Sequence, residues 1–246
     1  MAKQTYILVG ADKGGVGKTT LSRTIIEYFT ALNLPLTAFD TESPNGALIR
    51  YHSSVTHIVD VFSTIDQRRI FEPTLSAPPV VLVDFRAGSF LQTLSTLEQI
   101  GVLSRAESGE FEIVLMHLVA PTIVSLQEQI EVREFKKTCR HFVVQSFAGK
   151  SAFFEDRKDI VHDYIGDIPP EQRLQVPTLN QMAFEAVDVM GTTFFDFATS
   201  EDPNINSPQH SLVLRGYTQS WLATIWDEFD RIGLRDIVLN NFNQSF

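Results

Sequence analysis

The amino-acid sequence predicts an α/β fold in which a mostly parallel central sheet is covered by helices on both faces. Short apolar runs alternate with segments of helical periodicity over most of the 246 residues. Alternating strands and helices build sheets of this kind, and their strands are apolar because both faces are buried. A glycine-rich loop joins the first apolar run, 5–10, to the first helical segment, 21–32. We expect one domain over residues 1–246, because no linker or repeat interrupts the alternation.

The remaining elements follow from the spacing of apolar residues and from the residues that end each segment. The other predicted strands lie at 36–40, 55–62, 80–84, 111–116, 141–146 and 173–177. The other predicted helices lie at 66–71, 91–102, 121–140, 151–164, 180–190 and 214–232. Thr178 and Gln181 form a predicted capping box, and Gly191 ends the helix that follows it. The last helix is predicted to pack on the sheet through Leu214, Tyr217, Trp221, Ile225, Phe229 and Ile232.

Composition points to a protein with a well-filled core and no membrane partner. Hydrophobic residues make up 43% of the chain, and 19 of its residues are Phe. No apolar run approaches the roughly 20 residues that span a bilayer. No leader is evident before the first strand, and the single Cys139 cannot form an internal disulfide. We therefore expect a cytoplasmic protein.

The charge balance weighs against strong non-specific binding to DNA. The net charge is −10, whereas contacts to phosphates need clustered Lys and Arg. One local exception is a basic stripe on the predicted helix 121–140, formed by Arg133, Lys136, Lys137 and Arg140. The stripe is either a solvated helix face or a contact for DNA or another anionic partner.

The glycine-rich loop is the clearest functional motif, because it lies between a strand and a helix. It has the sequence Lys13-Gly14-Gly15-Val16-Gly17-Lys18-Thr19-Thr20. Glycines allow backbone N–H groups to turn inward around phosphate oxygens, and the following helix directs its positive end at the same anion. Lys18 is predicted to reach the β- and γ-phosphates, and Thr19 to face Mg²⁺. The alternative is a glycine-rich turn that binds nothing.

The string K-G-G-V-G-K-T-T resembles the deviant phosphate loop of the ParA/MinD family of dimeric P-loop ATPases. The general P-loop pattern G-x-x-x-x-G-K-[ST] begins with glycine. This chain has Asp12 at that position, so it departs from the general pattern at its first residue. The resemblance spans eight consecutive residues and extends weakly over most of the chain. It implies a Rossmann-like, three-layer P-loop NTPase fold, with ATP or ADP and Mg²⁺ as ligands.

The resemblance also assigns a role to Lys13. In the family, the lysine at this position crosses the interface of a dimer to the phosphates bound by the other subunit. It therefore implies an ATP-dependent homodimer, with Lys13 as a catalytic residue in trans. The alternative is a solvated loop charge.

Carboxylates follow two of the predicted strands and are candidates for the magnesium site and for catalysis. Asp84 directly follows the apolar run 80–83. In P-loop enzymes, the acid that holds Mg²⁺ also lies at the end of an apolar strand. Asp40 lies 22 residues after Lys18 and matches the first Asp of the D-x-D-P pattern in the family. Glu42 stands where the family has the Asp that is linked to the attacking water, and Ser43 adds one residue before Pro44. A purely structural role of Asp40 and Glu42 in capping the next turn is the alternative.

Four further residues are predicted at the same end of the sheet. Gln145 takes the place where relatives often have an adenine-reading Asn, and Pro177 begins the loop that lies over the base in the family. Arg86 follows Asp84 and either faces phosphate or a partner, or forms a surface salt bridge. His117 is expected at the tip of its strand as a satisfied loop or core histidine.

The function implied by the resemblance is that of a Mg²⁺-dependent ATPase acting as an ATP-driven dimerisation switch. Roles in plasmid or DNA partition, in transfer, or in cargo positioning fit such a switch, and so does a protein activator or cargo adaptor as partner. The alternative is a nucleotide-binding adaptor with little or no hydrolysis that recruits a protein in its ATP-bound dimer. The altered Glu42–Ser43 segment favours this alternative.

Overall fold

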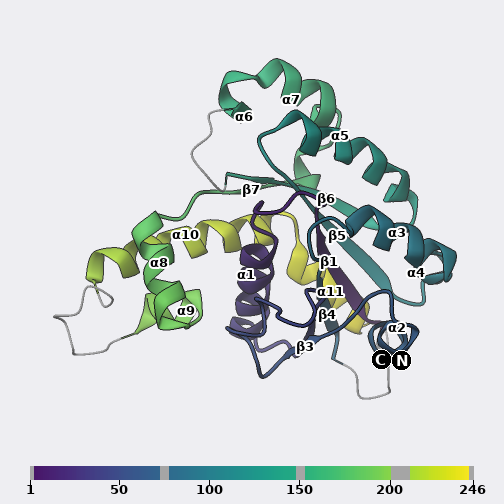
Figure 1. Ribbon diagram of the computed structural model, residues 1–246, viewed down its shortest axis with the longest axis horizontal. Coiled ribbons are helices and arrows are strands. Elements are labelled where there is room, and N and C mark those ends of the chain that lie inside the picture. The colour runs from purple at the N-terminus through teal and green to yellow at the C-terminus, as the bar shows by residue number, and fades with distance from the viewer. Residues whose placement is uncertain (1–2, 73–77, 148–152, 201–210, 244–246) are drawn as a thin grey trace.

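The computed structural model describes residues 3–72, 78–147, 153–200 and 211–243, and it confirms the predicted fold class. Seven parallel strands form one sheet in the order β3-β2-β4-β1-β5-β6-β7 (Figure 1). Their bounds are β1 Thr5–Gly10, β2 Leu36–Asp40, β3 Thr56–Ile58, β4 Val80–Asp84, β5 Glu112–Val119, β6 Arg140–Ser146 and β7 Arg173–Val176.

Helices cover both faces of this sheet. They are α1 Lys18–Ala31, α2 Thr64–Phe71, α3 Phe90–Gln99, α4 Val102–Glu107, α5 Ile123–Val132, α6 Phe153–Asp156, α7 Lys158–Ile165, α8 Gln181–Met190, α9 Phe194–Thr199, α10 Leu212–Arg231 and α11 Leu234–Asn243. Two short 3₁₀ helices, η1 Arg133–Lys137 and η2 Pro170–Gln172, complete the described elements. Within the described ranges, no helix is both long and apolar enough to cross a membrane.

The alternation of side chains in β1 divides the core into two layers. Ile7 and Val9 pack in one layer with α1, α8, α9, α10 and α11. Tyr6 and Leu8 pack in the other layer with α2, α3 and α4. Successive residues of a strand point to opposite faces, so every residue of this central strand is buried.

Two buried charged residues of α1 attach α9 to the body of the protein. Glu27 accepts the backbone N–H groups of Phe194 and Phe195, at 3.1 and 2.8 Å, where α9 begins. The Arg23 guanidinium lies between the rings of Tyr51 and Phe194, at 3.5 and 3.9 Å from their centroids. These contacts fix α9 beside α1, on the left of Figure 1.

The predicted helix 121–140 is wrong in its second half. α5 ends at Val132, residues 133–137 form η1, and β6 begins at Arg140. The carbonyl of Phe135 accepts the Thr138 hydroxyl at 3.0 Å and the Cys139 thiol at 2.9 Å, so the chain turns there toward the sheet.

The basic stripe predicted for that helix is not formed by one helix face. Arg133 pairs with Asp167 at 2.7 Å, and Arg140 pairs with Glu112 at 3.2 Å. The side chains of Lys136 and Lys137 lie outside the described residues, so a contact of this region with DNA stays a prediction.

Four smaller predictions also need correction. His117 lies inside β5 and is fully buried, because the strand continues to Val119. Asn180, and not Thr178, caps α8, since its side chain accepts the Ala183 N–H. Tyr217 is 51% exposed, while the rest of its predicted stripe is buried. α9 and α11 were not predicted, because α9 is short and α11 has no clear boundary signals in the sequence.

Candidate functional site

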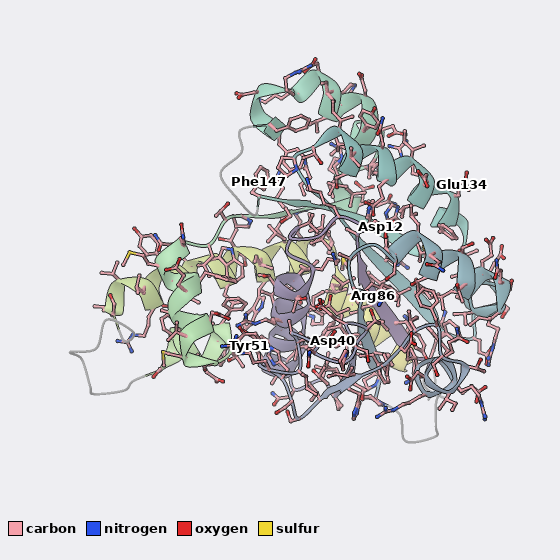
Figure 2. The ribbon with its side chains drawn as sticks, viewed as in Figure 1. Asp12, Asp40, Tyr51, Arg86, Glu134 and Phe147 are labelled. Carbon is pink, nitrogen blue, oxygen red and sulfur yellow. The ribbon has the colours of Figure 1, made fainter. Side chains whose placement is uncertain are left out.

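A cleft of about 1110 Å³ opens at the carboxyl edge of the sheet. It is lined by the loops that follow β1, β2 and β4, and by the segment between β7 and α8. Figure 2 labels Asp40, the last residue of β2, and Arg86 and Asp12, which come just after β4 and β1; β2, β4 and β1 are consecutive strands of the sheet. Ligands of parallel α/β sheets bind at this edge, so the cleft is the candidate functional site.

The glycine-rich loop forms one wall of the cleft, and its backbone has the conformation that such a loop requires. Gly15 and Gly17 have φ values of 72° and 94°, in the left-handed region that favours glycine. α1 begins directly after Gly17, so its N-terminal N–H groups face the cleft. Gly14, Gly15, Gly17, Lys18, Thr19 and Thr20 all line the cleft, whereas Val16 is buried in the core. This cradle suits an anion such as phosphate.

Lys18 is the buried cation of the cleft. Its ammonium group donates to the carbonyl of Lys13 at 3.0 Å, which folds the side chain back over the loop. Burial lowers the pKa of Lys18, and the nearby negative charges of Asp84 and Glu128 oppose this shift. A phosphate in the loop would offer the ammonium a charged acceptor in place of a neutral carbonyl.

Asp84 is the deepest acid in the cleft. Its side chain is buried, and its Oδ1 has no hydrogen-bond partner in the described part of the chain. Burial raises the pKa of Asp84 to about 7, and the negative charge of Asp40 adds to this effect, while the Thr19 hydroxyl favours the charged form. A buried carboxylate oxygen without a partner, next to a threonine hydroxyl, fits a hard divalent cation such as Mg²⁺.

A magnesium ion here would need ligands from the nucleotide. The described residues contain no group of three or more His, Cys, Asp or Glu side chains that could hold a metal. Mg²⁺ is commonly held by one or two carboxylates together with phosphates and water, and Thr19 and Asp84 are suited to that arrangement.

Asp40 lies beside Asp84, but its carboxylate accepts hydrogen bonds from the loop that follows β2. The two residues are direct neighbours in the pairing of β2 with β4. Asp40 accepts the N–H groups of Glu42 at 3.0 Å and of Leu48 at 2.9 Å, one on each carboxylate oxygen. A side chain at Gly46 would approach Asp40 Oδ2 to 2.3 Å, so this turn requires glycine. These contacts match the structural alternative for Asp40.

Glu42 and Arg86 lie on two loops that are tied together at the mouth of the cleft. The Arg86 N–H donates to the Thr41 hydroxyl at 2.9 Å, and the Thr41 N–H donates to the Asp84 carbonyl at 3.0 Å. Glu42 and Arg86 are both exposed and both line the cleft. Within the described residues, Arg86 forms none of the salt bridges of this protein, so the salt-bridge alternative has no support there.

Lys13 lies outside the lining of the cleft. Its side chain is exposed, and its ammonium group donates to the Thr122 hydroxyl at 3.2 Å. Within one chain, Lys13 and Lys18 therefore point to different partners. Lys13 is thus an exposed lysine beside the glycine-rich loop, bonded to the start of α5.

The far end of the cleft contains Pro177 but not Gln145. Gln145 is buried within β6, which continues to Ser146, and Ser146 lines the cleft instead. The Pro177 carbonyl accepts the indole N–H of Trp221 at 2.7 Å, which holds the β7–α8 segment against α10. Of the two residues predicted to contact the base, Pro177 lines the cleft and Gln145 does not.

Sequence reasoning missed the aromatic and polar residues that line this end. Trp221 was assigned to the core, and Phe184 and Glu185 of α8 were not singled out, yet all three line the cleft. The helical periodicity of α8 shows only which residues share a face. That this face borders the cleft follows from long-range packing between α8 and α10.

Comparisons with known proteins give a limited likeness. Neither a protein-family model nor a curated protein sequence matches the chain. Among solved structures, the MinD cell division protein of Aquifex aeolicus is similar with a TM-score of 0.46 and 13% identity, over 89% of this chain and 97% of that chain. FtsY of Mycoplasma mycoides is similar with a TM-score of 0.34 and 15% identity, over 58% of this chain and 51% of that chain. What the cleft binds is therefore inferred from its own residues.

Asp84→Asn is expected to stabilise the metal-free protein, and the gain should increase with pH. The pKa of about 7 in the folded chain lies above the ordinary value of 3.8. Between these values the unfolded chain releases a proton that the folded chain retains, so the stability of the wild type falls as the pH rises. The full difference, reached above pH 7, is at most about 4 kcal/mol.

Urea unfolding in the presence of a chelator, at about pH 5 and about pH 8, measures this difference. Asp163→Asn, on the exposed side of α7, is the matched control and should show no pH-dependent gain. A gain for Asp84→Asn that is the same at both pH values would contradict the assignment of a buried, raised-pKa carboxylate.

Proposed function

We propose that this protein is a Mg²⁺-dependent P-loop ATPase of the ParA/MinD type, acting as an ATP-driven dimerisation switch. The observation that carries the proposal is the cradle of Gly14–Thr20, with two left-handed glycines, set on the N-terminus of α1 and facing the buried Asp84. Such a cradle binds phosphates through backbone N–H groups, and the adjacent acid would support a metal ion beside them.

Different residues of the cleft have the proposed roles in phosphate binding, metal binding and catalysis. Lys18 binds the β- and γ-phosphates, while Thr19 and Asp84 would hold Mg²⁺, which would neutralise part of the charge on the phosphates. Glu42 orients the attacking water from the loop after β2. Arg86 supplies a second positive charge at the same edge. The segment after Pro177 receives the base.

The exposed position of Lys13 supports the proposed dimerisation. Two copies that face each other across their clefts would bring each Lys13 to the phosphates of the other copy. ATP then favours the dimer and hydrolysis dissolves it, so that a partner protein can read the nucleotide state. Plasmid or DNA partition, transfer or cargo positioning are the processes we propose for such a switch, with a protein activator or cargo adaptor as the partner.

ATP-dependent dimerisation is expected to be lost in Lys13→Ala. Light scattering should show the wild-type mass doubling with ATP and Mg²⁺ but not with ADP. The variant should stay monomeric, because facing phosphates repel each other unless a cation neutralises them. Lys158→Ala, an exposed lysine of α7, should dimerise like the wild type. A wild-type monomer with every nucleotide would contradict the switch.

The second candidate is an adaptor that binds ATP without turnover, and the exposed Glu42 followed by Ser43 is the observation that favours it. For an ATPase, Glu42→Ala is expected to lower the hydrolysis rate by about 100-fold and to leave ATP affinity within about threefold. Phosphate release and calorimetry measure the two quantities, with the exposed Glu171→Ala as control. Equal, negligible turnover in wild type and Glu42→Ala would establish the adaptor instead.

A further inference from the structure

α5 contacts the phosphate-binding loop at two points, although the two segments lie far apart in the sequence. Thr122, the N-cap of α5, accepts the ammonium group of Lys13 at 3.2 Å. Farther along the helix, Glu128 Oε1 accepts the backbone N–H of Asp12 at 2.8 Å. Glu128 is only 8% exposed, so its carboxylate is withdrawn from water and needs such donors.

His117 holds the Glu128 carboxylate in place. Its Nε2 lies 3.1 Å from Glu128 Oε1, which accepts the proton when Nε2 carries it. His117 is fully buried in β5, directly beside Gly10 at the end of β1. Its ring packs on the rings of Phe90 and His141, with centroids 5.6 and 5.9 Å away. The acceptor for Asp12 is therefore fixed by the sheet itself.

Asp12 stands where the general P-loop pattern has glycine, and its N–H, its carbonyl and its side chain each form a hydrogen bond. Its N–H donates to Glu128, its carbonyl accepts the Gly88 N–H at 2.8 Å, and its Oδ1 accepts the Phe90 N–H at 2.6 Å. An N–H directed at Glu128 is turned away from the phosphates. The bond therefore fixes the peptide plane at which the loop leaves β1, before the N–H groups of 14–20 turn inward.

We propose that Glu128 is a positioning residue that fixes the backbone of the phosphate-binding loop through the N–H of Asp12, an inference that rests on the proposed function. The lysine that follows, Lys13, can then leave Thr122 for a second molecule without moving the cradle behind it. The negative charge of Glu128 also favours the charged form of Lys18. The buried carboxylate of Glu128 thus fixes the backbone of the loop and also favours the positive charge of Lys18.

The test compares ATP·Mg²⁺ affinity, measured by calorimetry, in four variants of the full chain. Glu128→Ala removes the acceptor and should weaken binding about tenfold or more, the effect of losing a charge-assisted hydrogen bond. Glu128→Gln keeps an oxygen for the Asp12 N–H but removes the charge, so its affinity should fall between those of the wild type and Glu128→Ala. Glu128→Asp keeps the charge but retracts the oxygen, so its affinity should also fall between those of the wild type and Glu128→Ala. Glu131→Ala, exposed on the same helix, should bind as the wild type does.

Hydrogen exchange separates positioning from a general loss of stability. The Asp12 amide should exchange faster in Glu128→Ala and Glu128→Asp, while amides of β4 and β5 remain as protected as in the wild type. If Glu128→Ala does not fold, the Asp and Gln variants carry the comparison. Wild-type affinity and unchanged Asp12 exchange in Glu128→Asp would overturn the inference.

The two proposals fail in different ways. A wild type that binds no ATP contradicts the proposed function, and the exchange of the Asp12 amide then decides alone whether Glu128 positions the loop. A wild type that binds ATP, with the same affinity in every Glu128 variant, contradicts only the role of Glu128.

Discussion

The glycines of the loop have no side chains with which to fix its backbone, and this constraint shapes the surroundings of the cleft. The cradle of Gly14–Thr20 depends on residues outside it. The loop after β4 contacts Asp12 through Gly88 and Phe90, and α5 contacts it through Glu128. Each support comes from an element that the sheet already fixes. A loop that is preorganised in this way can bind an anion without first being ordered.

Charge is the second constraint on the cleft. Among the described residues, its lining includes the carboxylates of Asp40, Glu42, Asp84 and Glu185, and the cations Lys18 and Arg86. These acids would repel a triphosphate. They are consistent with the proposal that the ligand binds together with Mg²⁺, since the ion converts repulsion between acid and phosphate into attraction. The cost of burying Asp84 in the metal-free protein is consistent with this dependence.

Much of the sheet edge could be predicted from the sequence, because its signals are local. The apolar runs that end in Gly10, Asp40 and Asp84 predict strands whose bounds match those in the structure. The end of the helix 121–140 was not predictable from periodicity, which continues past Val132. The role of Glu128 and the placement of α8 along the cleft arise from contacts between distant segments, and no local pattern contains that information.

The central claim is that the cradle at the start of α1 binds the phosphates of a nucleotide. Calorimetric titration of ATP·Mg²⁺ into the wild type and into Lys18→Ala tests it most directly. We expect one nucleotide per chain for the wild type. The variant should lose about 100-fold in affinity, because the buried ammonium is the main protein cation on the phosphates. Equal affinity in both proteins, or no binding by the wild type, would contradict the claim.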